Sequence, residues 1–297
     1  RRVHADVYTN AGPQRAMRAP GHPQGCFITE LLMDELADQI QMDPVEFRLK
    51  NLPSKAPNAM WADYFPKAAQ KFGWSKRHPT GDSTPGPIKT GFGCAANRWG
   101  GGGRGSQARC EIHPDGGVVI RCGTQDIGTG IRTIVQMITA ETLGIPFEAV
   151  IPEIGDSVYP FSGGSGGSTT SPSVSPAIRI TAEKARAEFA DRLASALGVD
   201  ATDVVVRDGR VLIGEDTSKT MSWKEACRRL GTEPVSVDGK WERGLSSSGS
   251  SGVQLAEVEV DIETGVTKVK RITIVQDCGL VLDPLTAESQ VYGGVIM

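Results

Sequence analysis

Two strand-turn-strand patterns constrain the fold of this chain more than any other feature of its sequence. In the first, apolar and polar residues alternate over 108–112 and 118–122, on either side of a turn at 115–117. In the second, the alternating runs lie within 253–275, around a turn at 263–265. Because successive side chains on a strand point to opposite faces, each pattern predicts an antiparallel hairpin with one buried face. The chain must therefore fold with β-sheets.

Both hairpins run into the same short motif, an Asp-x-Gly step. It lies at 126–128 after the first hairpin and at 277–279 after the second. Two interpretations stay open. The repetition can reflect two related subdomains that meet at a shared cleft, or a chance recurrence of a common strand-turn-strand pattern.

Helical patterns alternate with the strands. Residues 131–143, followed by Gly144, and residues 174–197, followed by Gly198, each predict a helix that ends at a glycine. A further strand is predicted at 148–154. Helices and strands mixed along the whole chain place the fold in the α+β class.

An amphipathic helix is predicted near the start of the chain, and we expect its apolar stripe to pack into the core. It ends before Asp43, because Pro44 disfavours helical geometry at the preceding residue, and a short second helix then runs to Lys50. Residues 75–90 are rich in Pro, Gly, Ser and Thr and predict a surface loop. The apolar stripe consists of Phe27, Ile28, Leu31, Leu32, Leu36 and Ile40.

Composition and motifs argue against several classes of function. The net charge of −3 offers no basic face for nucleic acid, and no run approaches the roughly 18 apolar residues that a membrane span needs. Six cysteines without CxxC spacing favour reduced, mostly buried thiols. Four histidines without an HExxH motif argue against a protein-bound metal, and no GxSxG motif supports a Ser-His-Asp triad. A cofactor is therefore the natural candidate for any difficult chemistry.

A glycine-rich loop at 123–130 closes a predicted strand and opens a predicted helix. The unpaired N–H groups and the positive dipole end of a helix start attract an anion, and glycines let it approach the main chain closely. The loop lacks the spacing of a dinucleotide motif and of a P-loop, so it does not indicate a nucleotide site. A purely structural glycine turn is the alternative.

Two other segments are candidate binding loops. Residues 162–171 combine glycines and hydroxyls just ahead of a long helix, where they could wrap a phosphate or a pterin edge; a flexible linker is the alternative. Residues 16–24 place Arg18 among small residues and prolines, where its guanidinium could hold a carboxylate, a phosphate or a structural carbonyl.

Together these segments resemble the molybdopterin-binding subunit of the xanthine dehydrogenase/aldehyde oxidase family, over essentially all 297 residues. Their order and spacing match the family as well as their composition. The motifs are Ala16-Met17-Arg18-Ala19-Pro20-Gly21-His22-Pro23-Gln24, the Asp-Ile-Gly-Thr-Gly loop at 126–130, the Gly/Ser loop at 163–171, Val258-Glu259-Val260-Asp261, Gln276-Asp277-Cys278-Gly279 and Gln290-Val291-Tyr292-Gly293-Gly294.

The resemblance implies two related molybdenum-cofactor-binding subdomains, in residues 1–155 and 156–297, the second truncated at its end. Arg18 and Ala19 would contact the cofactor beside the metal, and Pro20 would lie near the substrate. A second group would bind the pterin phosphate, or the pyrophosphate of a cytosine dinucleotide form: Gln125, Asp126, Gly128, Thr129 and Gly130. A third group would line the pterin from the opposite subdomain: Gly166, Gly167 and Ser168.

Two departures from the family pattern bear on the substrate. Many members have Arg-Gly-Phe-Gly where this sequence has Arg18-Ala19-Pro20-Gly21, so the aromatic ring that contacts planar heterocycles is missing and xanthine is a poor candidate. Thr129 stands where many members have Gln, as in some aldehyde-oxidising relatives.

The first residue is not Met and the last five are Gly293-Gly294-Val295-Ile296-Met297, so we expect a piece of a longer chain. The family's catalytic glutamate motif would lie beyond Met297, leaving no catalytic residue in this chain.

The implied enzyme inserts a water-derived oxygen into a carbon–hydrogen bond of a small aldehyde or N-heterocycle. Its expected partners are an iron–sulfur subunit and an FAD subunit, which carry the electrons away. We expect it in the cytoplasm, or in the periplasm if a partner carries an export signal. Two alternatives stay open: a split subunit that is active only with a partner chain, and a cofactor-free binding or scaffold domain of the same fold.

Overall fold

A computed structural model describes residues 3, 5, 7–13, 15–52, 58–214, 220–246 and 249–297. Their contacts form two compact units, one from Arg1–Trp99 with Ser250–Met297 and the other from Gly100–Gly249. The chain thus leaves the first unit, builds the second and returns. The boundary between family subdomains that we expected at residue 155 stays a prediction. The compact units meet at other points of the chain, between residues 99 and 100 and between residues 249 and 250.

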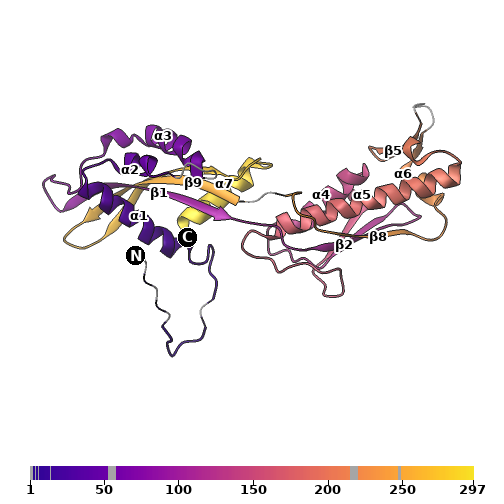
Figure 1. The fold of residues 1–297 in the computed structure, drawn as a ribbon, viewed down its shortest axis with the longest axis horizontal. Coiled ribbons are helices and arrows are strands. Elements are labelled where there is room, and N and C mark those ends of the chain that lie inside the picture. The colour runs from indigo at the N-terminus through magenta and orange to yellow at the C-terminus, as the bar shows by residue number, and fades with distance from the viewer. Residues whose placement is uncertain are drawn as a thin grey trace. The chain divides into compact units, whose positions relative to one another are not determined.

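A three-stranded sheet forms the centre of the first unit (Figure 1). Its strands lie in the order β1 (Ile88–Gly100), β9 (Gly249–Asp261) and β10 (Thr267–Asp277). β9 and β10 are antiparallel, with Thr267 opposite Val260 and Asp277 opposite Ser251, which confirms the second predicted hairpin. The partner of this hairpin, β1, comes from a segment about 150 residues earlier in the chain, as expected for a sheet built from distant segments.

Four α-helices accompany this sheet: α1 (His22–Gln39), α2 (Pro44–Lys50), α3 (Trp61–Phe72) and α7 (Pro284–Ile296). Short 3₁₀ turns lie on either side of α3, at Asn58–Met60 and Trp74–Lys76. The first two helices confirm the predicted pair and its break at Pro44. α3 and α7 were not predicted. The core lies mainly between α2, α3 and the sheet and contains Val45, Phe65, Ala68, Phe72, Trp74, Cys94, Ala96, Val253 and Leu255.

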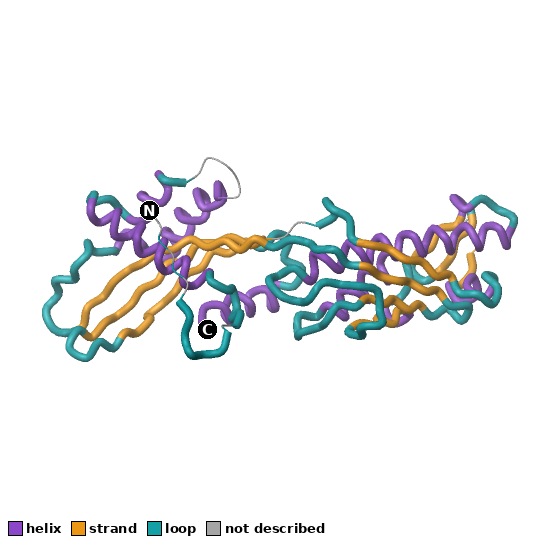
Figure 2. The backbone as a smooth tube through the Cα atoms, turned by 60° about the horizontal axis from the view of Figure 1, so that its bottom comes forward, coloured by secondary structure: helices purple, strands orange, loops and turns teal. Residues whose placement is uncertain are grey.

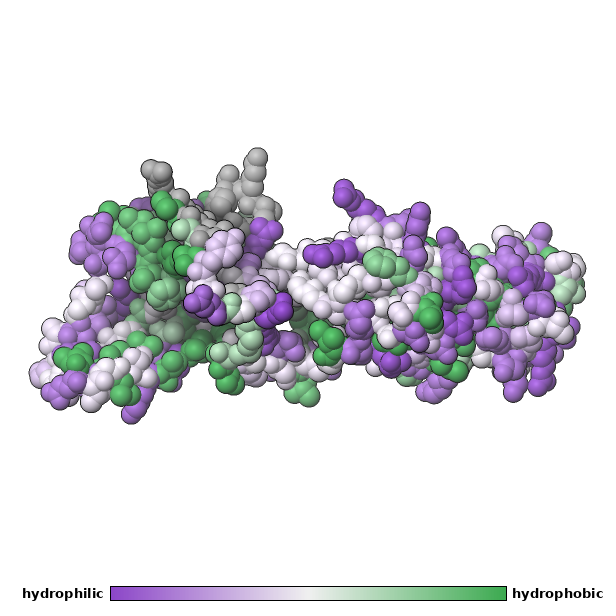
Figure 3. Space-filling view, turned by 90° about the horizontal axis from the view of Figure 1, so that it is seen from below, coloured by the Kyte–Doolittle hydropathy of each residue, from purple (hydrophilic) through white to green (hydrophobic). Residues whose placement is uncertain are grey.

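The apolar stripe of α1 does not pack into the core, so that expectation is wrong. Phe27 is 70% exposed, Ile28 66% and Leu32 56%. Of the residues of α1, only Ala37 is fully buried. The helix contacts α2 through its polar face, where Glu30 and Asp34 bind Arg48, and no described element covers the opposite face. Figure 3 shows the hydrophobic surface that this leaves. The periodicity of a sequence identifies the apolar face of a helix, but it does not show which element, if any, packs against that face.

The second unit is built on a four-stranded sheet in the order β4 (Val150–Ile154), β3 (Val118–Cys122), β2 (Gln107–Ile112) and β8 (Val235–Lys240). β2 and β3 form the first predicted hairpin, and β4 runs parallel to β3. α4 (Ile131–Leu143) makes the crossover that a parallel pair requires.

The long helix α5 (Thr170–Leu197) packs with α4 against this sheet, as Figure 2 also shows. The predicted ends at Gly144 and Gly198 are confirmed, since both glycines adopt the left-handed conformation after their helices. α5 begins four residues earlier than predicted and tolerates Pro176 in its interior.

A smaller sheet at the end of α5 was not predicted. It has the order β5 (Val204–Arg207), β6 (Arg210–Ile213) and β7 (Thr220–Ser222), and α6 (Trp223–Arg228) follows it. Two further 3₁₀ turns, Phe147–Ala149 and Ala201–Asp203, precede β4 and β5. Trp223 of α6 stacks on Phe189 of α5, with ring centroids 4.5 Å apart. This contact joins the small sheet to the main core of the unit.

The cysteines largely follow the expectation of buried thiols. Four are buried, Cys26 is half-buried and Cys278 is exposed. Burial raises the pKa of Cys94, Cys110 and Cys227 to about 12, so these thiols stay protonated at neutral pH. None of the helices that the structure describes is long and apolar enough to cross a membrane.

Candidate functional site

The first glycine-rich loop leaves the end of β3 and is fixed at its start by Gly123. The N–H of Gly123 donates a 2.7 Å hydrogen bond to the carbonyl oxygen of Pro160. A Cβ at this position would lie 2.9 Å from that oxygen, so the close approach of the two segments requires glycine. Gly123 is therefore explained by packing within the protein.

Asp126 organises the rest of this loop. Its Oδ1 accepts hydrogen bonds from the N–H groups of Gly128 (2.9 Å), Thr129 (3.1 Å) and Gly130 (3.3 Å), and its Oδ2 accepts one from the N–H of Arg132 (3.1 Å). The bond from Arg132, followed by those from the glycines and Thr129, holds the pKa of Asp126 below its usual value.

This arrangement changes the expected anion site. Three N–H groups of the loop just before α4, and that of Arg132 in its first turn, already donate to the chain's own carboxylate, although we expected this region to face a phosphate. The N-cap position of α4 is Gly130, and Asp126, four residues earlier, supplies one capping hydrogen bond to the helix through the N–H of Arg132. A phosphate at these amides would have to displace Asp126, so the remaining contacts of the loop carry the case for a binding site.

Gln125 supplies those contacts by joining the first loop to the second. The N–H of Ser165 donates to Gln125 Oε1 (2.9 Å), and the Ser165 hydroxyl donates to the Gln125 carbonyl oxygen (2.8 Å). Gln125 Nε2 in turn donates to the carbonyl oxygen of Gly123 (2.9 Å). The two loops, expected in separate subdomains, therefore lie side by side in one compact unit.

The second loop ends in a strained turn at the start of α5. Gly167 has a φ of 63° and Ser168 a φ of 61°, a left-handed conformation that is uncommon for a residue with a Cβ. The Thr169 hydroxyl closes the turn by donating to the carbonyl oxygen of Gly166 (2.8 Å). The base of the loop is held by Ser162, whose hydroxyl lies 2.7 Å from that of Ser106. Gly166, Gly167 and Ser168 thus form an exposed, fixed turn rather than a loose linker.

The space around the paired loops can admit a planar polar group. An added Cβ at Gly128, Gly130 or Gly166 would meet nothing within 4 Å. The Oγ1 of Thr124, at the base of the first loop, is buried without a hydrogen-bond partner, and such an atom usually indicates a missing polar contact. Carboxamide, hydroxyl and backbone groups match the hydrogen-bonding edge of a pterin, so the residues present fit the implied cofactor.

Arg18 lies in the first unit, against helix α7. Its Nη2 donates to the carbonyl oxygen (3.1 Å) and to Oε1 (3.3 Å) of Gln290, and a Cβ on Gly293 would lie 3.2 Å from its Nη1. Ala19 has a φ of 57°, and its carbonyl oxygen accepts from the N–H of His22 in the first turn of α1. Two separate motifs of the sequence, at 16–24 and 290–294, therefore meet in space.

The second Asp-x-Gly step repeats the local geometry of the first. Asp277 Oδ1 accepts from the N–H of Gly279 at 2.8 Å, as Asp126 Oδ1 does from that of Gly128. Asp277 Oδ2 also accepts from the hydroxyl of Tyr64 at 3.0 Å. Partial burial and this bond raise the pKa of Tyr64. The motif ends the β9–β10 hairpin in the first unit, whereas the Asp126 loop belongs to the second.

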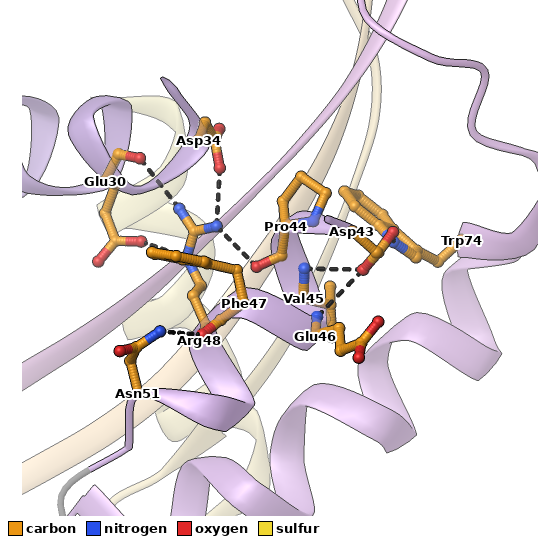
Figure 4. A network of polar contacts seen from close by, with 10 residues as sticks. All are labelled: Glu30, Asp34, Asp43, Pro44, Val45, Glu46, Phe47, Arg48, Asn51 and Trp74. Carbon is orange, nitrogen blue, oxygen red and sulfur yellow. Dashed lines mark hydrogen bonds and ion pairs between the residues drawn. The ribbon is translucent and has the colours of Figure 1, made fainter. Parts of the chain in front are cut away.

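Sequence reasoning missed Ser165, although its loop was predicted, and it missed Arg48 entirely. Arg48 is 4% exposed and binds Glu30 and Asp34 of α1 (Figure 4). The available signal was the placement of two acids four residues apart on the polar face of α1, where they can share one cation.

The sequence matches two family descriptions, both called molybdopterin cofactor-binding domain. One match covers residues 67–297 and the other residues 2–52. The chain belongs to the molybdopterin-binding subunits of the xanthine dehydrogenase/aldehyde oxidase family. The predicted family and the α+β fold are thereby confirmed.

Similar proteins include the aldehyde oxidoreductase molybdenum-binding subunit PaoC of Escherichia coli K12, which is 34% identical over 295 residues. That match covers 95% of this chain and 39% of PaoC. The putative xanthine dehydrogenase molybdenum-binding subunit XdhA of the same strain is 28% identical, over 98% of this chain and 42% of its own length. The chain thus spans about two fifths of these relatives.

Solved structures agree on the fold. Quinoline 2-oxidoreductase from Pseudomonas putida 86 superimposes with a TM-score of 0.68 at 20% identity, over 91% of this chain and 39% of its own. A Cu,Mo-CO dehydrogenase gives a TM-score of 0.69 at 22% identity, over 93% and 39%. At this level of identity the likeness establishes the architecture alone.

Proposed function

We propose that this chain forms part of the cofactor cradle in the catalytic subunit of a molybdenum hydroxylase that oxidises aldehydes. The observation that carries the proposal is the direct link between the two glycine-rich loops through Gln125 and Ser165. Two loops held together beside open space form a polar surface of the kind that a pterin needs.

Each loop contributes a different property to this surface. Gln125 fixes the spacing of the loops, while Asp126 holds Gly128, Thr129 and Gly130 in one conformation and so pre-organises them. Gly166, Gly167 and Ser168 would contact the pterin from the facing loop. Because the backbone amides are capped by Asp126, the proposal assigns the recognition of the cofactor to the side chain of Gln125 and to the hydroxyls around it.

The Arg18 segment is the proposed substrate-side element of the first unit. Arg18 is held against Gln290, and this fixes the neighbouring Ala19 and Pro20. Pro20 offers a small aliphatic ring in place of the aromatic ring found in xanthine-type members, so the proposal favours small aldehydes over planar N-heterocycles. The similarity to the PaoC subunit of an aldehyde oxidoreductase supports the same choice.

The bound molybdenum-pterin group, in its simple or cytosine dinucleotide form, would supply the oxidising centre that places a water-derived oxygen on the substrate and accepts two electrons. The proposal assigns the general base, a glutamate in this family, to polypeptide outside these 297 residues. Iron–sulfur and FAD subunits would receive the electrons. The iron–sulfur subunit, the FAD subunit and a location in the cytoplasm or the periplasm are all parts of this proposal.

Two other functions fit the same fold. A split subunit would be active only with a partner chain that supplies the missing motifs, and the flanking reading frame separates it from a truncated chain: a stop codon followed by a separate gene supports splitting. A cofactor-free scaffold would keep the fold and bind no pterin.

The test is to replace Gly128 and Gly130 together by Val in the chain co-expressed with its partner subunits, and to measure the released pterin by fluorescence. Both glycines have positive φ and border the open space, so valine would distort the loop and fill that space. We expect loss of pterin with the chain still folded. Gly265→Val is the matched control, since Gly265 also has positive φ and open surroundings but lies in the β9–β10 turn. Equal pterin in the double variant and the wild type would contradict the proposed site.

A further inference from the structure

The position of helix α1 in the first unit depends on one buried cation. Only Ala37 of this helix is fully buried, so burial of apolar surface does little to hold it. Its strongest described contacts run to Arg48 of α2: Nε donates to Glu30 Oε2 at 2.8 Å, and Nη1 donates to Asp34 Oδ1 at 2.7 Å. Figure 4 shows both carboxylates converging on this guanidinium.

Arg48 also holds the backbone of α1. Its Nη2 donates at 3.0 Å to the carbonyl oxygen of Glu30, so the helix itself is fixed as well as two side chains. Nη1 donates further to the carbonyl oxygen of Pro44 at 3.1 Å. A planar guanidinium presents several donors in fixed directions, and a lysine ammonium on a flexible stem does not reproduce them.

The other end of this connection is anchored in the core. α2 is capped by Asp43, whose Oδ1 accepts from the N–H groups of Val45 and Glu46. Asp43 Oδ2 accepts from Nε1 of Trp74 at 2.8 Å, and Trp74 belongs to the hydrophobic core of the unit. Arg48 therefore joins a rigid part of the unit to the middle of α1, while the start of the helix is also held by the ring of His22, whose centroid lies 4.5 Å from that of Trp99 in β1.

The Arg18 segment continues directly into this helix. The N–H of His22 donates to the Ala19 carbonyl oxygen, and the N–H of Gly25 donates to that of Gly21. Glu30 lies eight residues after His22, or about 12 Å along the helix axis. If α1 tilted by about 10° about Glu30, the Arg18 segment would move by about 2 Å. A displacement of this size is enough to disrupt a precisely positioned binding group.

We propose that Arg48 is a positioning residue: by fixing α1 to α2 it acts together with the Arg18–Gln290 contact to set the place of the Arg18, Ala19 and Pro20 segment. The guanidinium touches none of these three residues and acts through the helix. The inference rests on the proposed function only in assigning the segment a role beside the cofactor; the mechanical link itself does not depend on a bound cofactor.

The test compares amide hydrogen exchange in the full chain for the wild type, Arg48→Met and Arg48→Lys. The reporters are the N–H groups of His22 and Gly25, and the reference is the N–H of Gly73 at the end of α3, which donates to the Ala69 carbonyl oxygen. We expect exchange at the reporters to rise at least about tenfold in Arg48→Met and by less in Arg48→Lys, with Gly73 unchanged. Arg192→Met is the matched control, since Arg192 pairs with Glu188 within α5 of the other unit.

Two results would overturn the proposal. Exchange at His22 and Gly25 that stays at the wild-type rate would mean that α1 is held by other contacts. An equal rise at Gly73 would mean that Arg48 stabilises the unit as a whole. If Arg48→Met fails to fold, Asp34→Asn, which removes the charge of one half-buried partner and leaves Glu30 in place, is measured against the same reporters. Absence of molybdenum from the wild-type assembly would refute the proposed function and leave the exchange result standing.

Discussion

The link between the two glycine-rich loops gives the most direct structural prediction. Gln125→Ala removes the acceptor for the Ser165 N–H and the donor to the Gly123 carbonyl, whereas Ser165→Ala removes only the hydroxyl bond to the Gln125 carbonyl. The two substitutions remove different hydrogen bonds, but Gln125 and Ser165 contact each other in one network, so we expect their effects to be coupled and measure the double variant directly.

The size of the effect follows from the exposure of these bonds. Two of the three removed bonds join the loops to each other, and a net contribution of about 0.5–1 kcal/mol for each of these two gives about 1–2 kcal/mol for opening of the loops in the double variant. This corresponds to an increase of about 5–30-fold in the population of the open loop. Amide exchange over residues 162–168 measures that population, because the loop must open before its protected amides exchange.

Gln136→Ala is the matched control for this experiment. Gln136 is a half-buried glutamine of the same unit whose Nε2 donates to the Phe147 carbonyl oxygen at 3.0 Å, away from both loops. We expect it to leave exchange over residues 162–168 unchanged. A double variant of Gln125 and Ser165 that exchanges there within about twofold of the wild type would refute the idea that these bonds hold the loops together.

Three further predictions concern the second unit. Phe189→Ala removes a fully buried ring stacked on Trp223 and should lower the free energy of unfolding by about 3–5 kcal/mol in urea titrations; a loss below about 1 kcal/mol would mean that the site collapses without a cavity. Gly239→Ala would bring a Cβ within 2.9 Å of the backbone of Thr181, so we expect a cost of about 1–3 kcal/mol in the same assay, and wild-type stability would show that α5 and β8 are not so close. Because the folded state holds the pKa of Asp126 below its usual value, the cap on α4 is fully present above about pH 4 and is lost as the pH falls through the folded pKa. Exchange at the start of α4 should then rise on acidification, and Asp126→Asn should abolish this pH dependence; an unchanged pH profile in the variant would contradict the cap.

Local chemistry made much of the fold predictable from the sequence. Gly144 and Gly198 ended their helices as expected, because a left-handed residue after a helix favours glycine. Pro44 separated two helices for the equally local reason of its fixed ring. Both hairpins followed from period-two alternation.

Properties that depend on distant neighbours were not predictable in this way. The stripe that contains Phe27 and Leu32 has the spacing of a core face but stays exposed, since no element that the structure describes covers it. The β1 strand joins β9 across about 150 residues, and no local pattern encodes that pairing. The short strands β5–β7 and helix α6 are too brief for a periodic signal.

In the candidate site, too, local features were predictable from the sequence and contacts between distant residues were not. Glycine-rich helix entries identified the two loops, but only the fold revealed that Gln125 binds Ser165. The sequence also led us to expect free N–H groups at 126–130, whereas Asp126 accepts hydrogen bonds from them. A side chain that caps its own helix and one that leaves the helix start open for an anion look alike in the sequence.

The most direct test of the account is the content of molybdenum and pterin in the assembly purified with its co-expressed partner subunits. Molybdenum is measured by elemental analysis and pterin by fluorescence after oxidation, both relative to the amount of this chain. The account predicts stoichiometric molybdenum and pterin in the wild-type assembly. An assembly that is folded and complete but contains neither would contradict the cofactor cradle and support a scaffold that kept this fold without its chemistry.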